Sequence, residues 1–235
     1  MAVFVITWYR ETNGGRQGEL ALFELQSHFL QKHRGLSIQN HSLTLCIAIE
    51  GKPMTETDIT DHSNPGRLLV TFDNPQKQLH WEALGDRVMG GQSDGTVDHV
   101  EGGVGVFHGT VRLDNGGGFA SVKADLPEPV DATGFTGIEL LALGDGKTYK
   151  IGLRNTTERR SIVYQHAFTP DTEDWSRIRL PFNDFVPTWR GKTVEDAGPL
   201  ETGNLASVSL FVSGRQAGEF QLIMQNWRLF RSQAG

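Results

Sequence analysis

Hydrophobic and polar residues alternate with a period of two along most of the chain after residue 66. The alternation is clean at 175–180, and turn residues such as Gly, Asn, Asp and Pro separate the alternating segments. Short segments of this kind, with no comparable helical period between them, are typical of antiparallel sheets that bury one face. The pattern predicts an all-β domain over 67–235, and a two-layer β-sandwich is favoured over a closed barrel.

Nine segments carry the strand pattern, and turn signals lie between them. The turns are expected at 73–75, at Asp94-Gly95, at 101–103 and at Asn115-Gly116, where Asn-Gly favours a type I′ hairpin. The predicted strands are 68–72, 105–113, 119–124, 137–143, 148–154, 161–168, 175–180, 205–212 and 218–230.

Residues 1–66 follow a different pattern. An amphipathic helix is predicted over 19–33 and a short strand over 43–49, and a polar linker follows at 56–66. This short N-terminal α/β extension is interpreted as a small subdomain, as a packed arm, or as sequence that is not native. The third interpretation rests on Met54, which would serve as a start residue ahead of the β domain.

Composition narrows the class of partner. The chain has 235 residues, a formal charge of −6 and no evident cluster of Lys and Arg, which argues against nucleic acid. Cys46 is the single cysteine, so an intramolecular disulfide is impossible. The N-terminus lacks the pattern of a signal peptide and no stretch is long enough to span a membrane, so we expect a cytoplasmic protein.

The stretch 81–93 gathers several kinds of side chain next to a glycine pair. Trp81 precedes the adjacent acid and base Asp86 and Arg87, and Gly90-Gly91 predict tight backbone that side chains would forbid. One interpretation is a recognition loop at the rim of a sheet. From these residues alone a structural corner with an internal ion pair is favoured.

Sequence motifs for catalysis are incomplete. Gly91-Gln-Ser93-Asp-Gly95 matches a serine nucleophile elbow, but that motif requires a helix after the serine, and the sequence continues as a strand. His166 lacks an evident acid partner for a triad. The glycine-containing segments 103–109 and 144–148 do not meet the nucleotide-binding patterns that they resemble.

Metal and sugar sites are weighed in the same way. Of the eight histidines, four in the predicted β domain are scattered without metal-ligand spacing: His80, His99, His108 and His166. Calcium held by Asp73, Asp94 and Asp98 stays open, although a role in turns is favoured. No metal and no cofactor is predicted.

An aromatic side chain on a sheet face would allow sugar stacking, but most such residues are expected in the core; the candidates are Trp81, Tyr149, Tyr164, Trp175, Trp189 and Trp227.

With these motifs in view, the chain resembles the complex I intermediate-associated protein 30 (CIA30) family. The resemblance is carried by Trp81 and Asp86-Arg-Val-Met-Gly-Gly-Gln-Ser93, and continues through 115–121, 144–149 and Leu180-Pro-Phe182. It implies a jelly-roll β-sandwich of the galactose-binding type and a role as an assembly factor for respiratory complex I. It supplies no catalytic residue. The chain lacks the N-terminal pattern of a mitochondrial transit peptide, which favours a stand-alone member outside mitochondria.

The sequence therefore predicts a non-catalytic binding module with a protein partner, an assembly client. A carbohydrate-binding sandwich is the first alternative, and a serine esterase at Ser93 is the least favoured one. The expected recognition surface consists of Trp81, Asp86, Arg87, Met89, Gly90, Gly91, Ser93, Gly117 and Phe119.

Overall fold

The computed structural model describes residues 3–7, 44–48, 66–84, 93–100, 103–114 and 118–232. The chain separates into two units, Met1–Ile59 and Thr60–Gly235, and each is described by itself. In the first unit, β1 (Val3–Thr7) pairs antiparallel with β2 (Thr44–Ala48), with Val5 opposite Cys46. β2 lies within the strand predicted at 43–49. The predicted helix at 19–33, the linker and Met54 lie outside the described residues.

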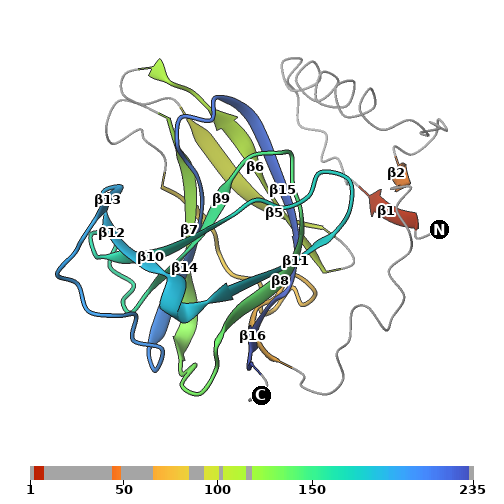
Figure 1. Cartoon of the computed structure of the whole chain (residues 1–235). Helices are drawn as coiled ribbons and strands as arrows, with labels where there is room; N and C mark the ends of the chain where they lie inside the picture. The colour runs from red at the N-terminus through yellow and green to blue at the C-terminus, as the bar shows by residue number, and fades with distance from the viewer. Residues whose placement is uncertain are drawn as a thin grey trace. The chain divides into compact units, whose positions relative to one another are not determined.

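The second unit is a β-sandwich of two seven-stranded antiparallel sheets, which confirms the all-β prediction (Figure 1). We call them sheet I, with strand order β13-β12-β10-β9-β14-β7-β4, and sheet II, with order β3-β16-β8-β15-β6-β5 and with β11 also paired to β8. Sheet I comprises β4 (Glu82–Ala83), β7 (Ala120–Val130), β9 (Tyr149–Arg154), β10 (Val163–Phe168), β12 (Val186–Trp189), β13 (Lys192–Thr193) and β14 (Leu205–Val212). Sheet II comprises β3 (Arg67–Val70), β5 (Asp94–Val100), β6 (Val104–Val111), β8 (Gly137–Leu143), β11 (Ser176–Pro181), β15 (Gly218–Gln225) and β16 (Trp227–Phe230).

The strand predictions hold with two corrections and one extension, since β7 runs on to Val130, beyond the strand predicted at 119–124. The pair Asp94-Gly95, predicted as a turn, is the beginning of β5. Gly95 stands opposite Gly109, and a Cβ on Gly109 would come within 2.3 Å of the Asp94 carbonyl oxygen. The absence of side chains thus allows close strand pairing, and the Asp94 carboxylate accepts a hydrogen bond from the Thr110 amide at 2.9 Å.

The second correction concerns the C-terminal segment, which was predicted as one strand over 218–230. It is divided into β15 and β16 at Asn226. The Asn226 side-chain oxygen accepts a hydrogen bond from the Phe72 amide at 2.7 Å, so this residue bonds to the chain near β3 instead of continuing the ladder. The strands missed entirely, β4, β12 and β13, have two to four residues each, too few for a period to show.

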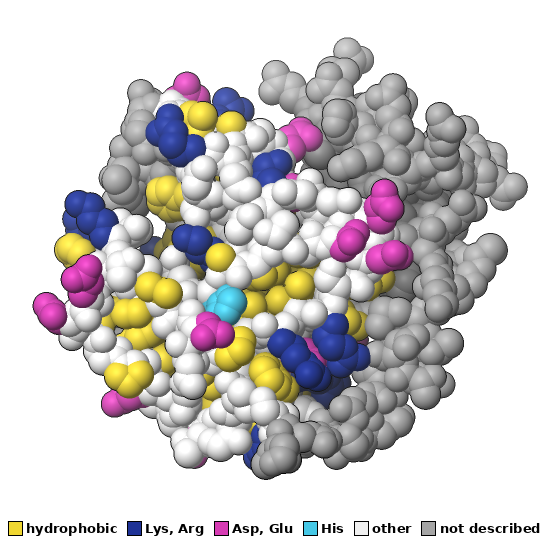
Figure 2. Space-filling model, in the orientation of Figure 1, with side chains coloured by type: hydrophobic (Ala, Val, Ile, Leu, Met, Phe, Trp, Pro, Cys, Tyr) yellow, Lys and Arg dark blue, Asp and Glu magenta, His cyan; other side chains and the backbone are white. Residues whose placement is uncertain are grey.

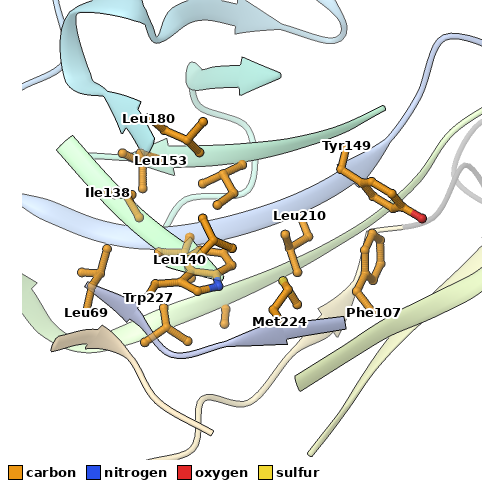
Figure 3. Packing of buried hydrophobic residues seen from close by; sticks show 14 of the residues in the cluster. Leu69, Phe107, Ile138, Leu140, Tyr149, Leu153, Leu180, Leu210, Met224 and Trp227 are labelled. Carbon is orange, nitrogen blue, oxygen red and sulfur yellow. The ribbon is translucent and has the colours of Figure 1, made fainter. Parts of the chain in front are cut away.

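The hydrophobic core lies between the two sheets (Figure 3). Trp227 from sheet II and Tyr149 from sheet I are fully buried in it, and the Tyr149 ring meets Phe107 edge-on with centroids 6.3 Å apart. The Tyr149 hydroxyl donates to the Asp145 carboxylate at 2.8 Å, and burial raises the pKa of Tyr149. Both aromatic side chains, which the sequence offers as sugar-stacking candidates, are therefore core residues.

The segment after β11 is a short helix whose aromatic side chains are buried. A 3-10 helix, η3 (Phe182–Asp184), follows Pro181, and the rings of Phe182 and Phe185 pack with centroids 6.3 Å apart. Both rings are buried. The segment 180–185 therefore forms a strand exit held by aromatic packing.

Candidate functional site

Three of the nine residues predicted for the recognition surface are described by the structure: Trp81, Ser93 and Phe119. Trp81 packs against Trp227 with ring centroids 6.0 Å apart, so the residue before the glycine-rich stretch is fixed to the core. Phe119 is half-buried just ahead of β7. The other six lie outside the described residues and stay a prediction: Asp86, Arg87, Met89, Gly90, Gly91 and Gly117.

Ser93 has a structural environment. Its side chain is buried, and its hydroxyl donates to the Arg112 carbonyl oxygen at 3.1 Å and accepts from the Arg112 amide at 3.0 Å. The strand β5 follows it directly. A nucleophile elbow needs an exposed hydroxyl at a strand-to-helix turn. Ser93 has neither feature, so the geometry offers no support for an esterase.

The histidines and acids considered as metal ligands have other partners. His108 Nε2 lies 2.8 Å from Asp98 Oδ2, and Asp73 pairs with the Asn226 side chain. His99 packs against the Phe72 ring, and burial lowers its pKa below the usual 6.5. No group of three or more His, Cys, Asp or Glu side chains in the described part of the chain could hold a metal ion.

The feature that sequence reasoning missed is the outer face of sheet I, which faces away from the core. Strand register places one row of side chains across six strands of this face: Glu82, Lys123, Ser209, Gly152, Gln165 and Val186. A neighbouring row holds Asp125, Ser207 and Arg154. The middle of the face holds the small residues Ser209 and Gly152, with the side chains of Val163 and Phe211 against Gly152. Charged and amide side chains stand on either side. We call this surface the polar face.

Two cations of the polar face are buried. Lys123 is 3% exposed and pairs with the Asp125 carboxylate, whose own side chain is 51% exposed. Arg154 is 4% exposed, and its Nη1 donates to the Ser209 hydroxyl at 2.7 Å. Its Nε–H has no acceptor among the residues that the structure describes. Burial lowers the pKa of Arg154 to about 10 against the attraction of Asp125, so the guanidinium is still charged at neutral pH.

A hollow of about 110 Å³ opens beside Lys123. It is lined by His80, Glu82, Lys123 and Asp125. Arg159, in the connection between β9 and β10, reaches Glu82 in an exposed ion pair that neutralises this carboxylate. Arg154 does not line the hollow but is attracted by Asp125, so Lys123 and Arg154 against Asp125 leave a net charge of about one positive unit in this region.

The hollow adjoins the predicted recognition loop in the chain. Leu84 directly follows β4; its amide donates to the Ser121 carbonyl oxygen of β7 and its carbonyl oxygen accepts from the Ser121 hydroxyl, each at 2.8 Å. The glycine-rich stretch begins at the next residue. The loop predicted from sequence is therefore attached at the β4 edge of the polar face.

A sequence signal for the polar face exists, but hydrophobic periodicity conceals it. In β14 the residues between the aliphatic positions are Ser207 and Ser209, and both are fully buried. Arg154 stands at the end of β9 after Gly152, in a strand with little other polarity. Serines and an arginine in strands otherwise rich in aliphatic residues indicate that polar side chains on the outer face bond to one another and are shielded from water.

Comparison with known proteins identifies the family. The family model for complex I intermediate-associated protein 30 (CIA30) matches residues 70–224, most of the β-sandwich. The chain belongs to the CIA30 family. This confirms the resemblance seen in the sequence motifs.

Three relatives illustrate the match. An uncharacterized protein of Schizosaccharomyces pombe is 28% identical over 68% of this chain and 83% of its own length. Mitochondrial complex I intermediate-associated protein 30 of Mus musculus is 21% identical over 74% of this chain, but the match spans only 57% of the mouse protein. The Neurospora crassa protein of the same name is 22% identical over 68% of this chain and 71% of its own length.

Solved structures show the same fold. The family 11 carbohydrate-binding module of a Clostridium thermocellum cellulase superposes with a TM-score of 0.54 at 16% identity, over 72% of this chain and 96% of the module. The same family 11 module in complex with a mixed-linked tetrasaccharide gives a TM-score of 0.52, also at 16% identity, over 72% and 98%. This likeness establishes the jelly-roll β-sandwich and says nothing about the ligand.

Among the described residues, no helix is long and apolar enough to cross a membrane.

Proposed function

We propose that this chain is a non-catalytic binding module that contacts a protein client during assembly of a larger complex, and that the polar face is its contact surface. The client is a respiratory complex or another multisubunit assembly. Two CIA30 relatives carry names that associate them with complex I intermediates, which supports this role. The predicted rim residues from Asp86 to Gly91 would border the same surface, because that stretch continues from β4.

One observation carries the proposal: Lys123 and Arg154 are buried on a sheet face with one carboxylate between them. Removing a charge from water costs several kcal/mol unless partners compensate, and hydrophobic side chains of similar size often stabilise a fold equally well. The stability of the fold alone thus gives no reason to place two cations here. Recognition of a partner with complementary charge gives such a reason.

The described residues of the polar face carry both signs of charge, with Glu82 and Asp125 near Lys123 and Arg154, which fits a protein client better than a polyanion. On the face drawn in Figure 2, Lys and Arg side chains are interspersed with Asp, Glu and hydrophobic ones. Protein interfaces are mixed in this way, with a few buried charged or aromatic anchors. The nucleic-acid reading stays disfavoured for the same reason.

Affinity purification from the native host tests this function. Wild type and Arg154→Met are compared by quantitative mass spectrometry, with Arg179→Met as the matched control, because Arg179 is exposed on sheet II. We expect the co-purified client to fall at least tenfold with Arg154→Met and to stay unchanged with Arg179→Met. Equal recovery with both variants, or loss only with Arg179→Met, would contradict the proposal.

A second candidate, glycan binding, is favoured by one feature of the same face. Phe211 lies on the polar face, and a Cβ on Gly152 would come within 2.8 Å of its ring, so the ring lies over the small-residue centre. Aromatic rings on a sheet face can stack on sugars. Binding on a glycan array that disappears with Phe211→Ala would support this function, and an array without signal would remove it.

A further inference from the structure

Resting on the proposed function, we infer that the hollow beside Lys123 is a receptor for one carboxylate group, presented by an acidic side chain or chain terminus of the protein client. The incoming carboxylate takes the place next to Lys123 that Asp125 fills in the free chain. Asp125 thereby acts as an internal stand-in for the ligand.

The donors around the hollow fit an oxyanion. Lys123, which lines the hollow, supplies an ammonium whose ionic partner among the described residues is Asp125. Arg154, two strands away and not part of the lining, has a buried N–H with no acceptor among those residues. Ser209 connects them, since it stands opposite Lys123 in the ladder and accepts from Arg154. Charge-assisted hydrogen bonds from ammonium and guanidinium groups are the strong interactions that select carboxylates in partly buried sites.

Size and charge favour a carboxylate over a phosphate. A volume of about 110 Å³ admits the end of an acidic side chain, since one water in the liquid takes roughly 30 Å³. The surrounding charge of about one positive unit matches a monoanion, whereas a phosphate brings up to two negative units. Asp125 and Glu82 at the wall would repel that excess charge.

The position of Asp125 makes exchange feasible. Its side chain is half exposed, in contrast to the buried side chain of Lys123, so rotation into water leaves the cation behind. An internal carboxylate that must be displaced weakens binding of the external one. Removing it should therefore strengthen binding, which a merely structural ion pair would not predict.

The test is an NMR titration of the full chain with N-acetyl-glutamate amide, and with the glutamine analogue as the neutral control. The readout is the Arg154 Nε–H resonance, assigned with Arg154→Lys, together with backbone amides to verify folding. We expect saturable shifts with the glutamate probe alone, loss of binding in Lys123→Met, and affinity about fivefold higher in Asp125→Asn, the scale of a partly exposed ion pair. A titration with inorganic phosphate is run in parallel.

Absence of a saturable shift in wild type, or unchanged affinity in Asp125→Asn with a native amide spectrum, would overturn the inference. Phosphate that binds more tightly than the glutamate probe would also overturn it, in favour of a phosphate site. The outcome is separable from the proposed function. A silent titration together with client capture that still depends on Arg154 removes the carboxylate receptor alone, whereas a positive titration without any client removes the assembly role alone.

Discussion

Strand β14 is buried on both of its faces, yet the two faces bury opposite chemistry. Toward sheet II it presents Val208, Leu210 and Val212, all with no exposed surface. Toward the polar face it presents Ser207 and Ser209, which are equally inaccessible. The first set is explained by hydrophobic burial, at about 25 cal/mol per Å² of apolar surface. The second set gains little from burial, and its hydroxyls are instead bonded to Arg154 and to the Thr156 carbonyl oxygen.

The comparison separates the part of the molecule that stabilises the fold from the part that is available for recognition. Substitutions on the inner face should change stability strongly and leave client binding to the folded fraction intact. Substitutions on the polar face should do the reverse. The following predictions probe this division, beginning with the largest effect.

Replacement of Trp227 by Ala should lower the free energy of unfolding by about 3–5 kcal/mol, because the ring is fully buried between the sheets and its loss leaves a cavity. Urea denaturation measures the change. Trp189→Ala is the control, since Trp189 is 46% exposed and its loss should cost about 0.5 kcal/mol or less. A loss below about 1 kcal/mol for Trp227→Ala would mean that the inner face is not the main source of stability.

Replacement of Gly105 by Ala should destabilise by about 1–3 kcal/mol through overpacking. The added methyl would come within 2.3 Å of the Phe72 ring, which is itself buried. Gly198→Ala is the matched control, because no atom lies within 4 Å of the added methyl there. Equal denaturation midpoints for the two variants would show that the side chains around Phe72 can repack to admit the added methyl, and would contradict tight packing at this position.

Replacement of Arg154 by Met should change the free energy of unfolding by less than about 1 kcal/mol in either direction, since a buried cation adds little net stability. The same variant should lose client capture, as proposed above. Stability is measured in urea on the purified chain. A loss of more than about 3 kcal/mol would assign Arg154 to the structural scaffold and would break the division between the two faces.

The smallest effect is expected at His99, beside Phe72. Burial lowers its pKa below 6.5, so the folded state binds the proton less well than the unfolded state. The stability that neutral His99 contributes to the fold is fully present above about pH 6.5 and declines as the pH falls toward the lowered pKa of the folded state. His99→Gln should therefore lose less stability than wild type between about pH 7 and pH 5 in parallel urea titrations. Identical pH dependence would show that His99 is readily protonated in the fold.

The sequence predicted the fold well because the fold depends on the inner face. The pattern of hydrophobic segments between turn signals located β8 and β14 to the residue, although 137–143 alternates only partly. The prediction of strand ends failed where hydrogen bonds to the backbone, and not the hydrophobic pattern, decide where a strand begins or stops. Gly95 was read as a turn residue but pairs with Gly109 in a close ladder, and Asn226 interrupts an otherwise continuous hydrophobic alternation through a bond to Phe72.

The site was harder to predict, because it is assembled from strands distant in sequence. Lys123 and Arg154 are brought together only because β14 inserts between β7 and β9. A single lysine or arginine in a strand pattern gives no indication of its neighbours or of its burial. The glycine-rich stretch 85–92 attracts attention in the sequence by its composition, whereas the polar face has no local motif.

Site-specific photo-crosslinking tests most directly whether the polar face is the contact surface. Benzoylphenylalanine is placed at Gln165, which adjoins Gly152 on the polar face, and at Thr96, an exposed residue of β5 on sheet II. After irradiation in the native host, the account predicts that a client is crosslinked from Gln165 and not from Thr96. Crosslinking of the same client from Thr96 alone, or equally from both positions, would contradict it.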